Sequence, residues 1–216
     1  MKKSVYSLVL MDDVVNAIDE LAYSLHTSRS NLINQILAER VALITPEQHL
    51  QRIFESLSDY LKPYTYFQIQ NQAADHMYSV KSALRYKYNP TIRYCVYLGQ
   101  QDGRLTGQLR IISRTQSDVL YYYLNEFFEI WAQIENEILP ANWESEEGSK
   151  WLRVLRLEHF QKSSQGVEIA GALSHYIKGL DDGLKIFFGE LENNLLQRTL
   201  LKEHYKNHYQ EVTYLI

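Results

Sequence analysis

The chain has 216 residues, of which 45% are hydrophobic, and its formal net charge at pH 7 is −4. This length and composition predict a folded protein of one large domain or two small ones, and the net negative charge argues against indiscriminate binding to nucleic acid. No run approaches the roughly 18 apolar residues that a membrane span needs, and the N-terminus lacks the pattern of a signal peptide. Cys95, the single cysteine, allows no internal disulfide. We therefore expect a cytoplasmic protein with no membrane partner.

The first forty residues predict a short strand followed by two helices. Side chains from Ser4 to Leu10 can alternate between two faces, which is typical of a strand. Acidic residues open a helix over 12–25, and Thr27 and Ser28 are good N-cap residues for a second helix over 29–43. A lone strand and two short helices cannot bury their apolar faces alone. The segment therefore predicts a homodimer.

This order of elements, with Thr27-Ser28-Arg29-Ser30 between the helices, resembles the ribbon-helix-helix family of Arc, MetJ and CopG-like repressors over residues 3–41. The resemblance implies that the strands of two chains pair into a ribbon in the DNA major groove, while the start of the second helix holds a phosphate. It also places His26 at a turn position that needs a left-handed backbone. Carried over residue by residue, the resemblance assigns base contacts to Val5, Ser7, Val9 and Lys3 and phosphate contacts to Ser28, Arg29, Ser30 and Lys2.

An alternative is that this segment dimerises without touching DNA. Residues 1–43 hold four basic residues against five acidic ones, a net charge of −1. Attraction to phosphate must therefore be local, because the segment as a whole carries no net positive charge.

The rest of the chain predicts an α+β arrangement. Thr45, Pro46 and Gln48 have the spacing of a capping box and predict a helix over 46–62. Alternating runs at 77–88, 91–98 and 104–113, separated by turn residues, predict a three-stranded antiparallel sheet. A helical apolar stripe predicts a long helix over 115–139 that covers the apolar face of this sheet. A polar loop at 141–149 and two or three helices from residue 150 follow, so the predicted domains are 1–43, for dimerisation and DNA binding, and 44–216, for an effector or partner.

Basic residues gather on the other face of the predicted sheet. Residues 76–114 hold seven lysines and arginines against one aspartate, a net charge of +6. One interpretation is a surface for an anion: DNA backbone, RNA, a phosphorylated ligand or an acidic protein. The other is the ordinary solvated side of an antiparallel sheet, or a face whose charges pair with the chain's own glutamate-rich segment 126–147. The residues of this face are Lys81, Arg85, Lys87, Arg93, Arg104 and Arg110.

Two further clusters have a structural and a functional interpretation. Tyr121–Tyr123 with Phe127 and Phe128 suit an aromatic pocket, but their helical spacing favours core packing. His204 and His208 lie four residues apart, a spacing that can hold zinc or nickel, although two histidines without a third ligand are more often surface residues. Since the sequence has no catalytic or cofactor-binding motif, we expect no enzyme, no cofactor and no metal.

These patterns predict a homodimeric, sequence-specific transcriptional regulator with a C-terminal sensor or interaction domain. Its expected partners are double-stranded DNA, a second copy of the chain, and an anionic ligand or protein. The alternative is an interaction scaffold or antitoxin-like protein that uses the N-terminal segment only to dimerise. A plain antitoxin is disfavoured, because its tail is usually short and disordered, whereas residues 44–216 have the composition to form their own core.

Overall fold

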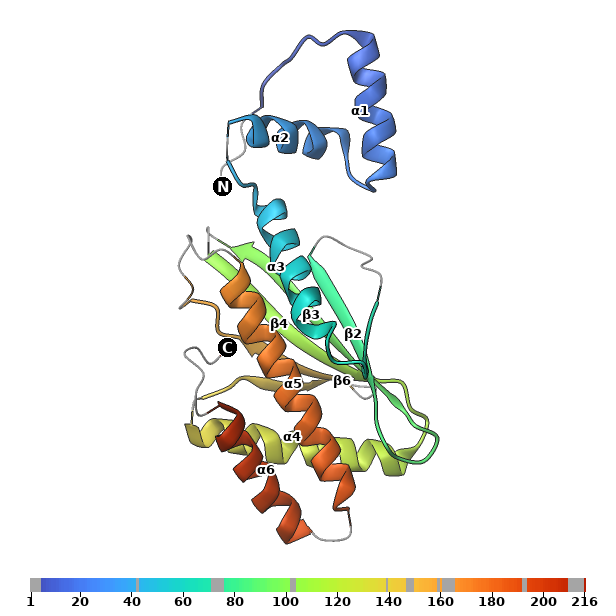
Figure 1. Cartoon of the computed structure of the whole chain (residues 1–216), viewed down its shortest axis with the longest axis vertical. Helices are drawn as coiled ribbons and strands as arrows, with labels where there is room; N and C mark the ends of the chain where they lie inside the picture. Colours follow the sequence, from blue (N-terminus) through green and yellow to red (C-terminus); the bar gives the residue numbers. More distant parts are fainter. Residues whose placement is uncertain are drawn as a thin grey trace. The chain divides into compact units, whose positions relative to one another are not determined.

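The computed structural model describes residues 5–41, 43–70, 76–101, 104–138, 140–146, 150–158, 160, 166–191, 194–209 and 216. The chain divides into two compact units, an N-terminal unit of residues 1–49 and a C-terminal unit of residues 50–216. In the described part of the chain, six helices accompany one antiparallel sheet of six strands (Figure 1). The protein is therefore of mixed α and β structure, with a larger sheet than the three strands predicted.

The N-terminal unit contains α1 (Asp12–Ser24) and α2 (Arg29–Arg40), which confirms the two predicted helices, although α2 is shorter than expected. His26, in the turn between them, has a φ of 52°, in the left-handed region expected at this position. The predicted strand is not formed, because residues 5–10 have no strand pairing in the single chain. A strand needs a neighbour for its backbone hydrogen bonds, and the described part of this chain supplies none there.

The next helix, α3 (Pro46–Leu61), begins with the predicted capping box. The backbone N–H of Gln48 donates to Thr45 Oγ1 at 3.1 Å, and the backbone N–H of Thr45 donates to Gln48 Oε1, also at 3.1 Å. The boundary between the two units falls after His49, inside this helix. The sequence placed the domain boundary after residue 43.

The sheet lies in the C-terminal unit, and each neighbouring pair of strands is antiparallel. Its central strands β2, β3 and β4 confirm the predicted antiparallel arrangement, with Val80 and Ile111 both in register with Tyr94. Segment 143–155 was predicted as loop and helix, which is wrong, because it forms β5 and β6. In spatial order the strands are β1 (Phe67–Ile69), β2 (Met77–Ala83), β3 (Thr91–Gln101), β4 (Arg104–Ser113), β6 (Lys150–Leu155) and β5 (Trp143–Glu146).

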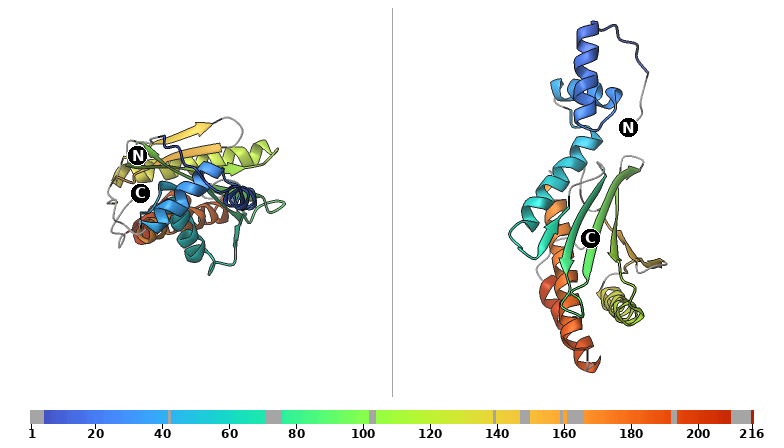
Figure 2. Two further views of the ribbon diagram at one scale, coloured as in Figure 1. Left: turned by 90° about the horizontal axis from the view of Figure 1, so that it is seen from above. Right: turned by 90° about the vertical axis from the view of Figure 1, so that its right-hand side faces the viewer.

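Helices α3, α4 (Asp118–Ile138) and α5 (Val167–Gly189) pack on one face of this sheet (Figures 1 and 2). Phe54 of α3 stacks on Tyr78, with ring centroids 5.9 Å apart, and Phe128 of α4 stacks on Trp151 at 4.4 Å. α6 (Asn194–Tyr209) packs against α5 and α4. The helix predicted at 115–139 therefore shares the apolar face with two others. Phe127 and Phe128 are buried in this core, and Tyr121 and Tyr123 pack against it.

Two buried acids tie the helices to the sheet. Asp181 of α5 accepts hydrogen bonds from Tyr94 Oη at 2.9 Å and from Ser82 Oγ at 3.0 Å. Burial raises the pKa of Asp181, and its ion pair with Lys185 opposes that rise. Glu135 of α4 accepts from Arg153 Nε at 3.1 Å. Each buried carboxylate thus has a cationic partner, as its removal from water requires.

Candidate nucleic-acid interface

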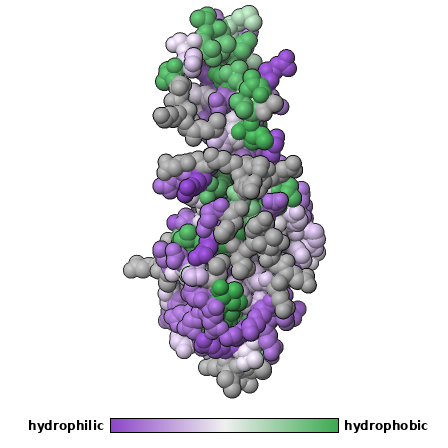
Figure 3. All heavy atoms as spheres, turned by 90° about the vertical axis from the view of Figure 1, so that its left-hand side faces the viewer, coloured by the Kyte–Doolittle hydropathy of each residue, from purple (hydrophilic) through white to green (hydrophobic). Residues whose placement is uncertain are grey.

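The N-terminal unit has very little core of its own. Among its described hydrophobic residues, only Ala22 and Leu32 are buried. Hydrophobic side chains instead gather on its surface (Figure 3), and an exposed apolar surface of this kind marks an interaction site. Fourteen large hydrophobic residues of this unit are at least 40% exposed: Val5, Tyr6, Leu8, Val9, Leu10, Met11, Leu21, Tyr23, Leu25, Ile36, Leu37, Val41, Leu43 and Ile44.

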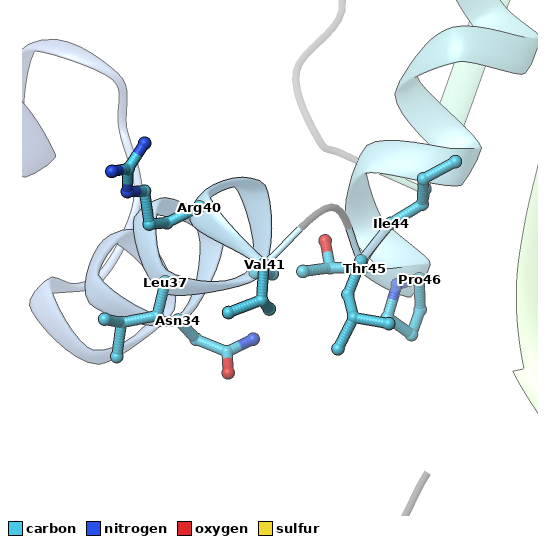
Figure 4. Close-up of a pocket in the computed structure, with 9 residues that line it drawn as sticks. Asn34, Leu37, Arg40, Val41, Ile44, Thr45 and Pro46 are labelled. Carbon is cyan, nitrogen blue, oxygen red and sulfur yellow. The ribbon is translucent and has the colours of Figure 1, made fainter.

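An apolar groove of about 320 Å³ lies between the end of α2 and the start of α3 (Figure 4). Its lining includes Leu37, Val41, Leu43 and Ile44, each more than half exposed. The groove thus continues the exposed apolar surface of α2. This position suits a hydrophobic side chain from another polypeptide.

The predicted phosphate residues lie together at the start of α2. Ser28 caps the helix, its hydroxyl accepting from the backbone N–H of Asn31 at 3.2 Å, and Ser28, Arg29 and Ser30 are all exposed. Arg29 is already engaged, because its Nε and Nη2 donate to both carboxylate oxygens of Asp19 on α1. These bonds and the charge of Asp19 raise the pKa of Arg29. A phosphate at this position would share Arg29 with Asp19.

The predicted base-contacting residues lie on the segment before α1. Val5, Ser7 and Val9 are exposed, with Val5 and Val9 fully so. Lys2 and Lys3, assigned to phosphate and to a base, lie outside the described residues. Since residues 5–10 are unpaired in one chain, a ribbon that presents these side chains together needs a second chain.

The basic residues predicted to share one sheet face are only partly brought together. The register pairs buried Val80 with buried Tyr94, so the alternate residues Lys81 and Arg93 point to the face opposite the helices, which we call the outer face. Arg110 of β4 is on this face, and Arg104 lies at its far hairpin end. Arg85 and Lys87 are not on the sheet, because β2 ends at Ala83 and residues 84–90 turn.

One cation of the outer face was not predicted from the sequence. Lys150 of β6 is exposed and in register with Ile112 of β4, so it projects from the same face. It was missed because residues 150–155 were assigned to a helix. Trp151 and Val154, which follow it, are strand formers, and they were the available signal.

The outer face is electropositive at its centre. Lys81 lies directly opposite Arg93 in the β2–β3 register, and neither forms an ion pair with any described residue. The Arg110 guanidinium lies 5.3 Å from the centroid of the Tyr97 ring. Burial raises the pKa of the Cys95 thiol between them, while the charges of Arg93 and Arg110 act in the opposite direction.

The two histidines suggested as metal ligands have other contacts. His204 Nε2 lies 2.8 Å from the carbonyl oxygen of Gly179, and His208 Nε2 lies 2.9 Å from that of His175. Within the described ranges, no group of three histidine, cysteine, aspartate or glutamate residues is placed to hold a metal ion. Nor does any helix in this part of the chain combine the length and apolarity needed to cross a membrane.

Comparison with known proteins identifies no relative. No family model matches the chain, and no curated protein or solved structure matches it significantly.

Proposed function

We propose that the protein is a homodimeric, sequence-specific DNA-binding transcriptional regulator. The N-terminal unit dimerises and contacts DNA, and the C-terminal unit binds an effector or partner. The observation that carries this proposal is the apolar surface of the N-terminal unit, whose described residues include two buried hydrophobic residues and fourteen exposed large ones. So small a unit gains too little from its own core and is stabilised by a second copy.

A second copy also gives residues 5–10 a role. Two such segments pair into an antiparallel ribbon, which satisfies their backbone hydrogen bonds and places alternate side chains on one face. Ser7 is then the polar residue between Val5 and Val9 on the face toward the bases. It supplies hydrogen bonds, while the valines supply apolar contact to thymine methyl groups.

The start of α2 supplies the phosphate contact in this proposal. Its backbone N–H groups and the positive end of the helix dipole favour an anion. Arg29 adds a charge-assisted hydrogen bond when phosphate competes with Asp19 for its guanidinium.

The test is selection of bound genomic fragments by the purified full-length chain. We expect one shared sequence with two-fold related half-sites, because a symmetric dimer contacts its operator twice. Recovery of fragments with no shared sequence would contradict sequence-specific regulation.

Two variants then separate the roles of single residues. Ser7→Ala should change the preference among recovered sequences more than the overall affinity. Arg29→Ala should weaken binding to every sequence and lower the salt slope by about 0.9. The matched control is Lys62→Ala, which removes another exposed cation that is ion-paired with a neighbouring aspartate. This control should bind as the wild type does.

A second candidate is a scaffold that uses the N-terminal unit only to dimerise. It is favoured by the engagement of Arg29 with Asp19 and by the net charge of −1 over residues 1–43. A dimer in solution that binds no DNA fragment would support this scaffold over the regulator.

A further inference from the structure

The outer face carries a row of cations that crosses the strands. Lys81 of β2, Arg93 of β3 and Lys150 of β6 share one row, with Ile112 of β4 between the last two. Arg110 of β4 lies two residues along, in register with Cys95 and Leu152. Four adjacent strands thus each contribute one cation.

The spacing of this row follows from the geometry of a sheet. Neighbouring strands lie about 4.8 Å apart, so β2 and β6, three steps apart, are separated by about 14 Å. Each strand of duplex DNA carries one phosphate per about 3.4 Å of helix axis, and successive phosphates lie farther apart than this rise because the strand also winds around the axis. The row of cations is therefore long enough to follow a few consecutive phosphates of a DNA backbone.

A solvated sheet face does not account for this arrangement. Like charges directly opposite each other on neighbouring strands are destabilising, and Lys81 and Arg93 are such a pair. On this face the acids of the described strands stand on the edge strand β5, where Glu144 is in register with Leu152 and Glu146 is in register with Lys150. An anionic partner along β2, β3 and β4 would relieve the repulsion.

We propose that the outer face of the sheet binds the backbone of double-stranded DNA, as a second contact separate from the N-terminal unit. The proposal rests on the proposed function, because duplex DNA is the ligand in both. Lys81, Arg93, Arg110 and Lys150 hold phosphates and read no sequence. Tyr97 and Gln108, paired in the neighbouring row, add uncharged hydrogen-bond donors beside them.

This contact compensates for the charge of the N-terminal unit. Residues 1–43 carry a net charge of −1, and Arg29 is partly neutralised by Asp19. Most of the electrostatic affinity for DNA, and most of its salt dependence, therefore comes from the outer face.

The test measures duplex binding by the full-length chain over a series of salt concentrations. The variant Lys81→Gln/Arg93→Gln removes two outer-face cations. The control Arg85→Gln/Lys87→Gln removes the same charge from the exposed turn beside β2, off the sheet. We expect the outer-face variant to lower the salt slope by about 1.8, equivalent to a loss on the order of 50-fold in affinity at 0.1 M salt. The control should change the slope by much less.

Folding and binding are separated by thermal unfolding of both variants. The outer-face variant should melt at or above the wild-type temperature, since it removes a like-charge pair outside the core. A folded outer-face variant whose salt slope equals that of the control overturns the proposal. The proposal is also overturned if the outer-face variant loses binding to an acidic polypeptide such as polyglutamate while its binding to duplex DNA is unchanged.

Arg29→Ala distinguishes this proposal from the proposed function. If Arg29→Ala lowers the slope and the outer-face variant does not, the outer-face proposal is wrong and the regulator stands. If only the outer-face variant lowers the slope, this contact is supported and DNA contact by the N-terminal unit is overturned. A wild-type chain that binds no duplex overturns both.

Discussion

At the scale of single residues, close packing around some glycines leaves no room for a side chain. A Cβ at Gly183 of α5 would lie 2.4 Å from Cζ3 and 3.1 Å from Cη2 of Trp131. Trp131 is fully buried, in ring contact with Phe127 and Tyr205. Since a packed core does not yield by a whole atomic radius, this glycine allows α5 and α4 to approach each other.

We therefore expect Gly183→Ala to reduce the free energy of unfolding by about 1–3 kcal/mol, the usual cost of overpacking. The matched control is Gly171→Ala in the same helix, where the nearest atoms belong to the Tyr60 ring at 3.9 Å. That change should be neutral or stabilising by up to about 1 kcal/mol, because alanine is the better helix former. Urea unfolding of both variants measures the difference, and equal midpoints would show that Trp131 can move aside.

Residues whose partners are near in sequence were predictable. The bonds between Thr45 and Gln48 and the cap at Ser28 join residues three apart, so the sequence suffices to predict them. The partner of Arg29 was not predictable in this way. Asp19 lies on the other helix, and its approach depends on how the turn at His26 directs α2.

At the scale of elements, the three central strands were predicted because their two faces differ clearly in polarity. Strands β5 and β6 were missed because their polarity does not alternate with burial. Arg153 points toward the core, where it is 3% exposed, while Val154 is 41% exposed. A charged residue on the core side of a strand makes sense only with partners from elsewhere, here Glu135 and the ring of Tyr176.

This arrangement predicts a large effect for Arg153→Met. The change leaves the Glu135 carboxylate buried without its cation, which should lower the free energy of unfolding by about 3–5 kcal/mol. Adding Glu135→Gln removes the unpaired charge, so the double variant should be more stable than the Arg153→Met single variant. Chemical denaturation of the three chains tests this, and a double variant less stable than Arg153→Met would contradict it.

Helix α6 is held to α5 by reciprocal hydrogen bonds between His175 of α5 and His208 of α6. Nε2 of His208 bonds to the carbonyl oxygen of His175 at 2.9 Å, and Nε2 of His175 bonds to that of His208 at 2.7 Å. The two rings stack with centroids 3.9 Å apart. Burial lowers the pKa of His208 to about 4, and the charges of His175, His204 and Lys178 act in the same direction, against the bond to the carbonyl of His175.

This lowered pKa predicts that acid destabilises the contact between α5 and α6. Because the folded pKa is about 4 and the unfolded value is 6.5, the unfolded chain binds more protons between these pH values. The stabilisation of the fold by neutral His208 is complete above pH 6.5 and is lost as the pH falls to about 4. Protection of the α6 amides against hydrogen exchange, corrected for the slower intrinsic exchange at lower pH, should fall over this range, and His208→Asn should reduce the pH dependence of the unfolding free energy by up to one proton. Identical pH profiles for wild type and variant would contradict it.

At the scale of the whole molecule, the sequence predicted helices and central strands but not what completes the N-terminal unit. Residues 5–10 alternate like a strand, yet one chain leaves them unpaired, and the apolar side chains of α2 are left exposed. Both features are explained if the folded molecule is a dimer of two chains. A pattern in one sequence indicates that a partner is needed, but it does not show the contacts that the partner makes.

The protein should therefore be a dimer through its N-terminal unit, and a charge on that surface should separate the chains. Val41, on the groove of α2 and 63% exposed, is the position to change. Val41→Glu places an unpaired carboxylate in the interface, which should raise the dissociation constant on the order of 100-fold, equivalent to about 3 kcal/mol. The matched control is Val119→Glu on α4, where the valine is 56% exposed in the other unit. Light scattering at micromolar concentration should give a dimer mass for wild type and control and a lower mass for Val41→Glu. A wild-type monomer with α1 and α2 folded would show that the exposed surface needs no second copy, and dimerisation through this unit would be wrong.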